Sequence, residues 1–179
     1  MSKITAYDKF IQQALKYGFS LFGLPKTGQT TIYQAGDDGT YKQGYPKTGA
    51  RFTDNGDGTI TDNATGLMWA KDGNGAGCNS GAKIAWSAAI TWAEGLTFAT
   101  HDDWRLPNVK ELQSIVDYGT STPAINTTYF PNTQFNYYWS STTFTTLSFI
   151  AWYVDFLGGY VNGTSKPTTI YVRAVRGGA

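Results

Sequence analysis

Hydrophobic positions along the chain recur with a helical period in three stretches. Residues 4–22 place apolar and charged side chains on different sides, which predicts an amphipathic N-terminal helix. A second helix is predicted over 84–96. A third begins at Asn108, an N-cap whose capping-box partner is Glu111, and is expected to end at Gly119. The expected buried faces are Trp86, Ala89, Ile90, Ala93 and Leu96 in the second helix and Val109, Leu112, Ile115 and Val116 in the third.

Turn residues at 55–58, Asn-Gly-Asp-Gly, predict a hairpin between two short strands. Because Asn-Gly and Asp-Gly favour tight turns with positive φ, Phe52 and Ile60 are expected on paired strands. The carboxylates here also allow a calcium hypothesis, but the spacing does not follow the EF-hand pattern. The weak calcium candidates are Asp54, Asp57 and Asp62.

Alternation of apolar and polar residues predicts further strands around the two central helices. Residues 67–69 predict a short buried strand, and 151–156 predict a strand with one apolar face. A closing strand is expected at 171–176, and a flexible loop carrying Cys78 at 73–81. This combination of separate helices and strands predicts an α+β fold with a short sheet and long loops.

The length of 179 residues is typical of a single domain. We expect the domain to span 24–179, preceded by the helix at 1–23. The apolar stripe of that helix is expected to pack on the domain or on a second subunit, which makes a homo-oligomer a candidate assembly.

The balance of charge and aromatic residues narrows the function classes. Lys and Arg number 14 against 13 Asp and Glu, and aromatic residues make up 16% of the chain. Such a balance argues against a nucleic-acid-binding surface, which needs excess positive charge. No stretch is apolar enough for a membrane span, and the N-terminus lacks a signal peptide. The absence of both signals is compatible with synthesis in the cytoplasm. Display on a virion or a cell surface is an option.

Candidate catalytic groups are sparse. One cysteine and one histidine exclude a Cys- or His-rich metal cluster, and no cofactor is expected. His101 beside Asp102 and Asp103 could act with a serine, but a solvated turn explains the same residues better. Most of the six tryptophans are expected in the core, and Arg173 and Arg176 are expected to be held by carboxylates or carbonyls. We therefore expect no enzyme.

Several phrases occur in an order that resembles the DUF1566 family. They are LPKTGQT at 24–30, GDDG at 36–39, RFTDNGDGT at 51–59, TGLMW at 65–69, DWRLP at 103–107, Glu111-Leu112, YWSST at 138–142, Ala151-Trp152 and YVRAVRGG at 171–178. The resemblance implies a C-type-lectin-like fold related to the formylglycine-generating enzymes. It also implies binding rather than catalysis, because the cysteine-dependent copper site of those enzymes cannot be formed with one cysteine.

Relatives in this family include bacterial adhesins and the variable proteins of diversity-generating retroelements. In the latter, mutated adenines in asparagine codons diversify a C-terminal binding surface, here about 139–178. The 18 positions between framework phrases contain no Lys, Glu, Gln, Met or Trp, which AAC codons cannot yield. Those types make up 27 of the 179 residues, so chance would give this roughly one time in twenty.

The resemblance and the apolar surplus together predict the ligand-binding residues. They are Phe144, Thr145, Thr146, Leu147, Ser148, Phe149, Ile150, Leu157, Tyr160, Asn162, Thr164, Thr168, Thr169 and Ile170. The expected ligand is a protein or a cell-surface molecule, since clustered exposed apolar residues are typical of binding patches. The alternative is a surface adhesin that binds glycans on Trp and Tyr side chains, with or without calcium.

Overall fold

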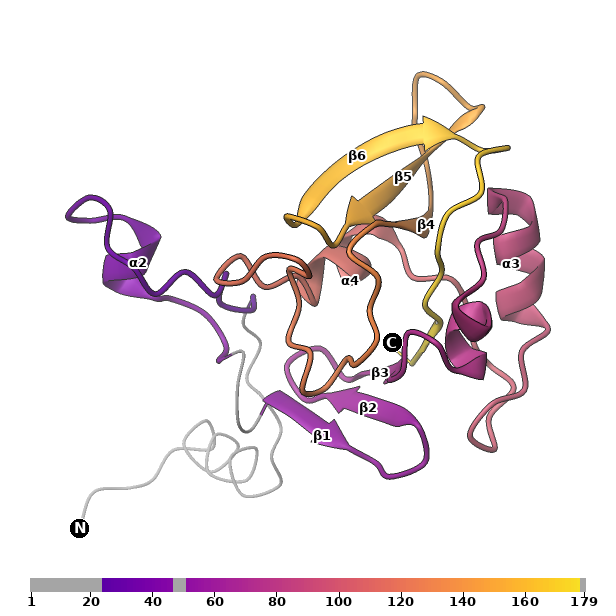
Figure 1. Cartoon of the computed structure of the whole chain (residues 1–179), viewed down its shortest axis with the longest axis horizontal. Coiled ribbons are helices and arrows are strands. Elements are labelled where there is room, and N and C mark those ends of the chain that lie inside the picture. Colours follow the sequence, from indigo (N-terminus) through magenta and orange to yellow (C-terminus); the bar gives the residue numbers. More distant parts are fainter. Residues whose placement is uncertain (1–23, 47–50, 178–179) are drawn as a thin grey trace, which may run out of the picture.

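The computed structural model describes residues 24–46 and 51–177 (Figure 1). The helix predicted at 4–22 lies outside these residues. In chain order the elements are α2 (Asp38–Tyr41), β1 (Phe52–Asp54), β2 (Thr59–Asp62), β3 (Leu67–Ala70), the 3-10 segment η2 (Ala76–Gly81), α3 (Trp86–Glu94), α4 (Val109–Ser114), β4 (Tyr137–Thr143), β5 (Ile150–Asp155), β6 (Tyr160–Ser165) and β7 (Val175–Arg176). The fold is α+β with two small antiparallel sheets.

One sheet has the strand order β1-β2-β3-β7. Its first hairpin is the predicted one, because Asp54 pairs with Ile60 and Phe52 with Asp62 around the turn at 55–58. The predicted strand at 67–69 is also confirmed as β3, which pairs with β2 and with β7 from the other end of the chain. This sheet therefore joins residues 52–70 to residues 175–176.

The other sheet has the order β4-β5-β6, with β5 in its centre. The prediction of a single apolar face on β5 is wrong, because both faces are covered. Val154 packs into one hydrophobic core with α4 and the first sheet, while Ala151 and Tyr153 pack into a second core with α3. A strand between two cores has no polar face, so its sequence alternation does not report which side is buried.

Both predicted central helices are present (Figure 1). Asn108 caps α4 by accepting hydrogen bonds from the backbone N–H groups of Lys110 and Glu111, and the Glu111 carboxylate completes the capping box. The expected end at Gly119 is wrong, since the helix ends at Ser114. Within the described ranges, no helix is long and apolar enough to cross a membrane.

Two further expectations need correction. The segment carrying Cys78 contains 3-10 turns rather than only a flexible loop, and Cys78 is buried. Burial raises the pKa of this thiol, so a reactive thiolate is not favoured. Of the strand expected at 171–176, only β7 forms, because Tyr171 instead makes an isolated parallel bridge with Tyr138.

Candidate functional site

The β4–β5 loop, residues 144–149, carries the largest part of the predicted ligand-binding set. Thr145 to Phe149 are all exposed, with Leu147 at 42% and Phe149 at 60%. This loop lies at the end of the sheet where β5 begins and β6 finishes, since Ile150 pairs with Ser165. The structure therefore brings the loop beside Thr164, Thr168 and Thr169, of which the last two are exposed.

Backbone and ring contacts fix the conformation of the 144–149 loop. Phe144 donates its N–H to the carbonyl of Ile150 at 3.0 Å, and Ile150 donates to Leu147 at 2.9 Å. The Phe144 ring stacks on Trp152 with centroids 4.6 Å apart, which leaves Phe144 half-buried. Gly163 lies opposite Trp152 on the neighbouring strand β6, and a Cβ on Gly163 would sit 2.8 Å from Ile150 Cγ2. Gly163 is thus a structural requirement of the loop contact.

Lys166 ties the loop to the rest of the domain. Its backbone N–H donates to the carbonyl of Phe149 at 2.9 Å, and its ammonium donates to the hydroxyl of Thr143 at 3.0 Å. The same ammonium lies 3.9 Å from the ring centroid of Trp86, on α3. These contacts hold exposed apolar side chains on a fixed scaffold, which lowers the ordering entropy that binding requires.

The predicted residues do not form one surface. Leu157 and Tyr160 lie at the opposite end of β5 and β6, because Tyr160 pairs with Asp155. At about 3.3 Å per residue, the length of β5 separates the two groups by roughly 17 Å. Ile170 does not belong to either group, since it is 3% exposed in the second core and its backbone pairs with Ile84. Its assignment to the ligand-binding surface was wrong.

Sequence reasoning missed Tyr137, an exposed aromatic residue of the second sheet. Tyr137, Asp155 and Tyr160 are neighbours across the three strands and so share one face of the sheet. The Tyr137 ring stacks on Tyr153 with centroids 4.4 Å apart, and both Tyr137 and Tyr160 are exposed. Burial and the nearby Tyr137 raise the pKa of Tyr153. The sequence signal for this placement was the alternation of residues along β4, which begins at Tyr137.

The two C-terminal arginines are held as predicted. Arg173 is fully buried and donates to the carbonyls of Ala70 and Lys71 and to the hydroxyl of Thr133. Arg176 forms an ion pair with Asp103 at 2.6 Å, and this pairing lowers the pKa of the Asp103 carboxyl. Both arginines therefore fasten the closing segment to the domain.

The three calcium candidates each bind a different partner within the protein. Asp62 is fully buried and pairs with Arg51 at 2.7 Å. Asp54 binds Lys71, which together with the N–H of Gly56 lowers the pKa of the Asp54 carboxyl. Asp57 accepts from the backbone and hydroxyl of Thr59. Over the described ranges, no group of three or more His, Cys, Asp or Glu residues is arranged to hold a metal ion.

Three of the six tryptophans, Trp69, Trp104 and Trp139, are fully buried. The remaining three are half-buried and contact the second core or Phe144. His101 packs against Trp104 at a centroid distance of 6.5 Å, and its backbone bridges to Phe98. The hydroxyl of Ser140 donates to the carbonyl of Trp152. The tryptophans therefore mainly build the core, and the histidine belongs to a packed turn.

The fold defines the described part of the chain as a small α+β domain with two sheets, one of which includes the last strand, β7. The family model of the Lcl C-terminal domain matches residues 58–176, which is 119 of the 179 residues. The chain belongs to this family, which is related to DUF1566, so the resemblance is confirmed at that level. A search of curated proteins found no match.

Proposed function

We propose that the chain is a non-catalytic ligand-display domain of the C-type-lectin-like class. Its binding surface comprises the 144–149 loop with the neighbouring residues Thr164, Thr168 and Thr169, and is called here the display surface. The observation that carries the proposal is the exposure of Leu147 and Phe149 on a loop held by Phe144, Lys166 and Gly163. Exposed apolar groups on a rigid loop favour binding of a protein or a cell-surface molecule.

The proposal includes diversification of this surface by a retroelement. Its support is the residue composition of the 18 positions between the framework phrases. Most of these positions also lie on solvent-exposed loops or on the edge strand β6. Leu157 and Tyr160 would form a second variable patch at the other end of the sheet. Changes at exposed positions usually alter stability by less than about 0.5 kcal/mol, so the fold would tolerate many variants.

A display library tests the binding capacity of the surface. Codons for Thr145, Thr146, Leu147, Ser148, Phe149, Thr168 and Thr169 are randomised in the full chain and selected against lysozyme as a model target. The control library randomises an equal number of exposed positions elsewhere: Ser87, Ala88, Thr91 and Glu94 on α3, and Thr97, Thr127 and Thr128. We expect both libraries to fold and the first to yield binders more often. Equal yields from both libraries would contradict a specialised surface.

A second candidate function is supported by Tyr137 and Tyr160. Exposed tyrosine rings on one face of a sheet can stack on sugar rings, so a glycan-binding adhesin is the alternative. Its calcium-assisted form is not proposed, because Asp62 is buried against Arg51 and the three candidates do not converge.

A glycan array distinguishes this alternative. Tyr137→Ala and Tyr160→Ala should each remove any glycan signal, while Tyr33→Ala, at a tyrosine exposed elsewhere, should leave it unchanged. Absence of a signal for the wild-type chain, or equal loss in all three variants, would exclude these tyrosines as a glycan site.

A further inference from the structure

Residues 24–46 fold into a separate loop that precedes the matched family region. Asp37 organises it, accepting hydrogen bonds from Gln29 Nε2 and the backbone N–H of Tyr33, both at 2.9 Å, and from the N–H of Thr40 at 3.0 Å. The hydrogen bonds from Tyr33 and Thr40 lower the pKa of the Asp37 carboxyl. At its base, Tyr45 donates to the carbonyl of Leu24 at 2.9 Å. In Figure 1 this loop, with α2, projects from the side of the domain.

The loop is joined to the domain at the turn that follows α4. Tyr118 donates its N–H to the carbonyl of Thr27 at 2.7 Å. Gly28 and Gly119 meet backbone to backbone, since a Cβ on Gly119 would lie 2.1 Å from the Gly28 oxygen. The LPKTG phrase at 24–28 is therefore part of this joint.

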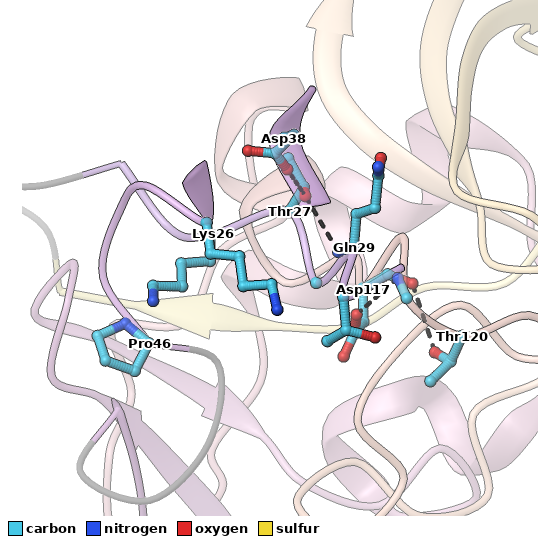
Figure 2. Close-up of a pocket in the computed structure, with 11 residues that line it drawn as sticks. Lys26, Thr27, Gln29, Asp38, Pro46, Asp117 and Thr120 are labelled. Atoms are coloured by element: carbon cyan, nitrogen blue, oxygen red, sulfur yellow. Dashed lines mark hydrogen bonds between the residues drawn. The ribbon is translucent and has the colours of Figure 1, made fainter. Parts of the chain in front are cut away.

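Two hollows lie side by side at this joint, with volumes of about 390 and 410 Å³. Lys26 and Thr27 line both hollows, and the two hollows together are called here the groove. Figure 2 shows the first hollow, where Lys26, Thr27 and Asp38 from the loop face Asp117 and Thr120 from the domain. The second extends along α4 to Lys110 and Gln113 and includes the exposed Leu24.

The groove collects the unpartnered lysines of the described ranges. Lys71 binds Asp54, Lys83 lies over the Tyr171 ring, and Lys166 lies over Trp86. The other three lysines of ranges 24–46 and 51–177 make no side-chain hydrogen bond, ion pair or ring contact, and all three line the groove. They are Lys26, Lys42 and Lys110.

The carboxylates of the groove do not neutralise these lysines. Asp38 accepts the hydroxyl of Thr27, and Asp117 accepts the N–H of Gly119 at 2.9 Å. Neither lies within ion-pair distance of a lysine. Three ammonium groups against two carboxylates leave the groove with a net positive charge, which favours an anionic ligand.

We propose that this groove binds an acidic peptide segment. No arginine lines it, so the two-pronged geometry that favours phosphate or sulfate groups is missing from the lining. Lysine ammonium groups are point charges that can donate hydrogen bonds to carboxylates from many directions. The two hollows share Lys26 in their linings and offer room for an extended chain, and the exposed Leu24 adds an apolar contact.

The interaction is weak and depends on salt. One pair of exposed opposite charges changes an equilibrium constant roughly 1.4- to fivefold, so loss of two pairs should weaken binding roughly 2- to 25-fold. Because the Debye length is about 10 Å at 0.1 M salt and about 3 Å at 1 M, high salt should abolish binding.

The test measures binding of a fluorescein-labelled octaglutamate peptide to the full chain by fluorescence anisotropy. The groove variant is K26Q/K42Q, and the charge-matched control is K71Q/K83Q, whose lysines lie outside the groove. We expect at least about twofold weaker binding for the groove variant, less than about 1.5-fold change for the control, and recovery in K26R/K42R. These thresholds follow from roughly 1.4- to fivefold per exposed pair.

Four outcomes would overturn the proposal. They are no binding by the wild type at low salt, unchanged binding by the groove variant, equal loss in the control, and a sulfated oligosaccharide that binds at the lysines where octaglutamate does not. The variant L147S/F149S should bind the peptide as the wild type does, so failure of the groove and failure of the display surface remain distinguishable.

Discussion

Replacing Asp62 by asparagine should destabilise the domain more than almost any other single change of charge. Asp62 accepts from Arg51 Nε at 3.0 Å and from Arg51 Nη2 at 2.7 Å, and both side chains are fully buried. Arg51 also donates to the carbonyl of Ser114, which links the first hairpin to α4. Asp62→Asn would leave the guanidinium buried without a counter-ion.

Removing one partner of a buried ion pair typically costs about 3–5 kcal/mol. Asparagine retains one acceptor oxygen, so we expect a loss of about 3 kcal/mol in the free energy of unfolding. With a slope of about 2 kcal/mol per molar urea, the midpoint should fall by roughly 1.5 M. Tryptophan fluorescence reports the transition, because three tryptophans are fully buried.

The matched control is Asp54→Asn, whose ion pair with Lys71 is partly exposed. An exposed pair is worth about 0–1 kcal/mol, so this variant should unfold close to the wild type. The double variant Arg51→Met with Asp62→Leu removes both charges and should recover much of the loss. A loss below about 1 kcal/mol for Asp62→Asn, or an equal loss for Asp54→Asn, would refute the reasoning.

Three further predictions concern stability. Asn108→Ala should lower the free energy of unfolding by about 1 kcal/mol, because the N-cap of α4 is lost, and urea unfolding would show no change if the cap were unimportant. Ile170→Ala should cost about 2–4 kcal/mol from its buried site, whereas Phe149→Ala should change stability by less than about 0.5 kcal/mol; comparable losses would contradict the two placements. Burial raises the pKa of Tyr138 from 10.0 to about 12. Between these values the unfolded state binds fewer protons than the native state, so stability should fall by about 1.4 kcal/mol per pH unit, and Tyr138→Phe should remove that slope in urea titrations at high pH.

Local rules explain which elements the sequence predicted. The capping box of Asn108 and Glu111 acts over three residues, and the turn at 55–58 fixes a hairpin over a similar distance. These sequence signals therefore predict their elements regardless of the tertiary contacts around them. The end of α4 was misjudged because Gly119 has the right chemistry for a helix end, but the chain turns five residues earlier.

Long-range packing explains what the sequence did not predict. Ile170 is buried because its backbone pairs with Ile84, 86 positions away, and no pattern near Ile170 indicates that partner. The register of β5 with β6 places Tyr160 far from Phe149 although both lie in the same predicted segment. Likewise, Lys26 and Lys110 are distant in sequence, and only the fold brings them to one groove.

The most direct measurement of the central claim is deep sequencing of the encoding locus across many cells of one population. A diversified display surface predicts a near-copy of the segment encoding 139–178 beside a reverse-transcriptase gene, with differences at adenines. Variation should fall in the codons for 145–149, Leu157, Tyr160, Thr168 and Thr169, and spare those for the buried residues Ala151, Tyr153 and Val154. An intact locus without a near-copy, or variation spread equally over buried and exposed codons, would contradict the account.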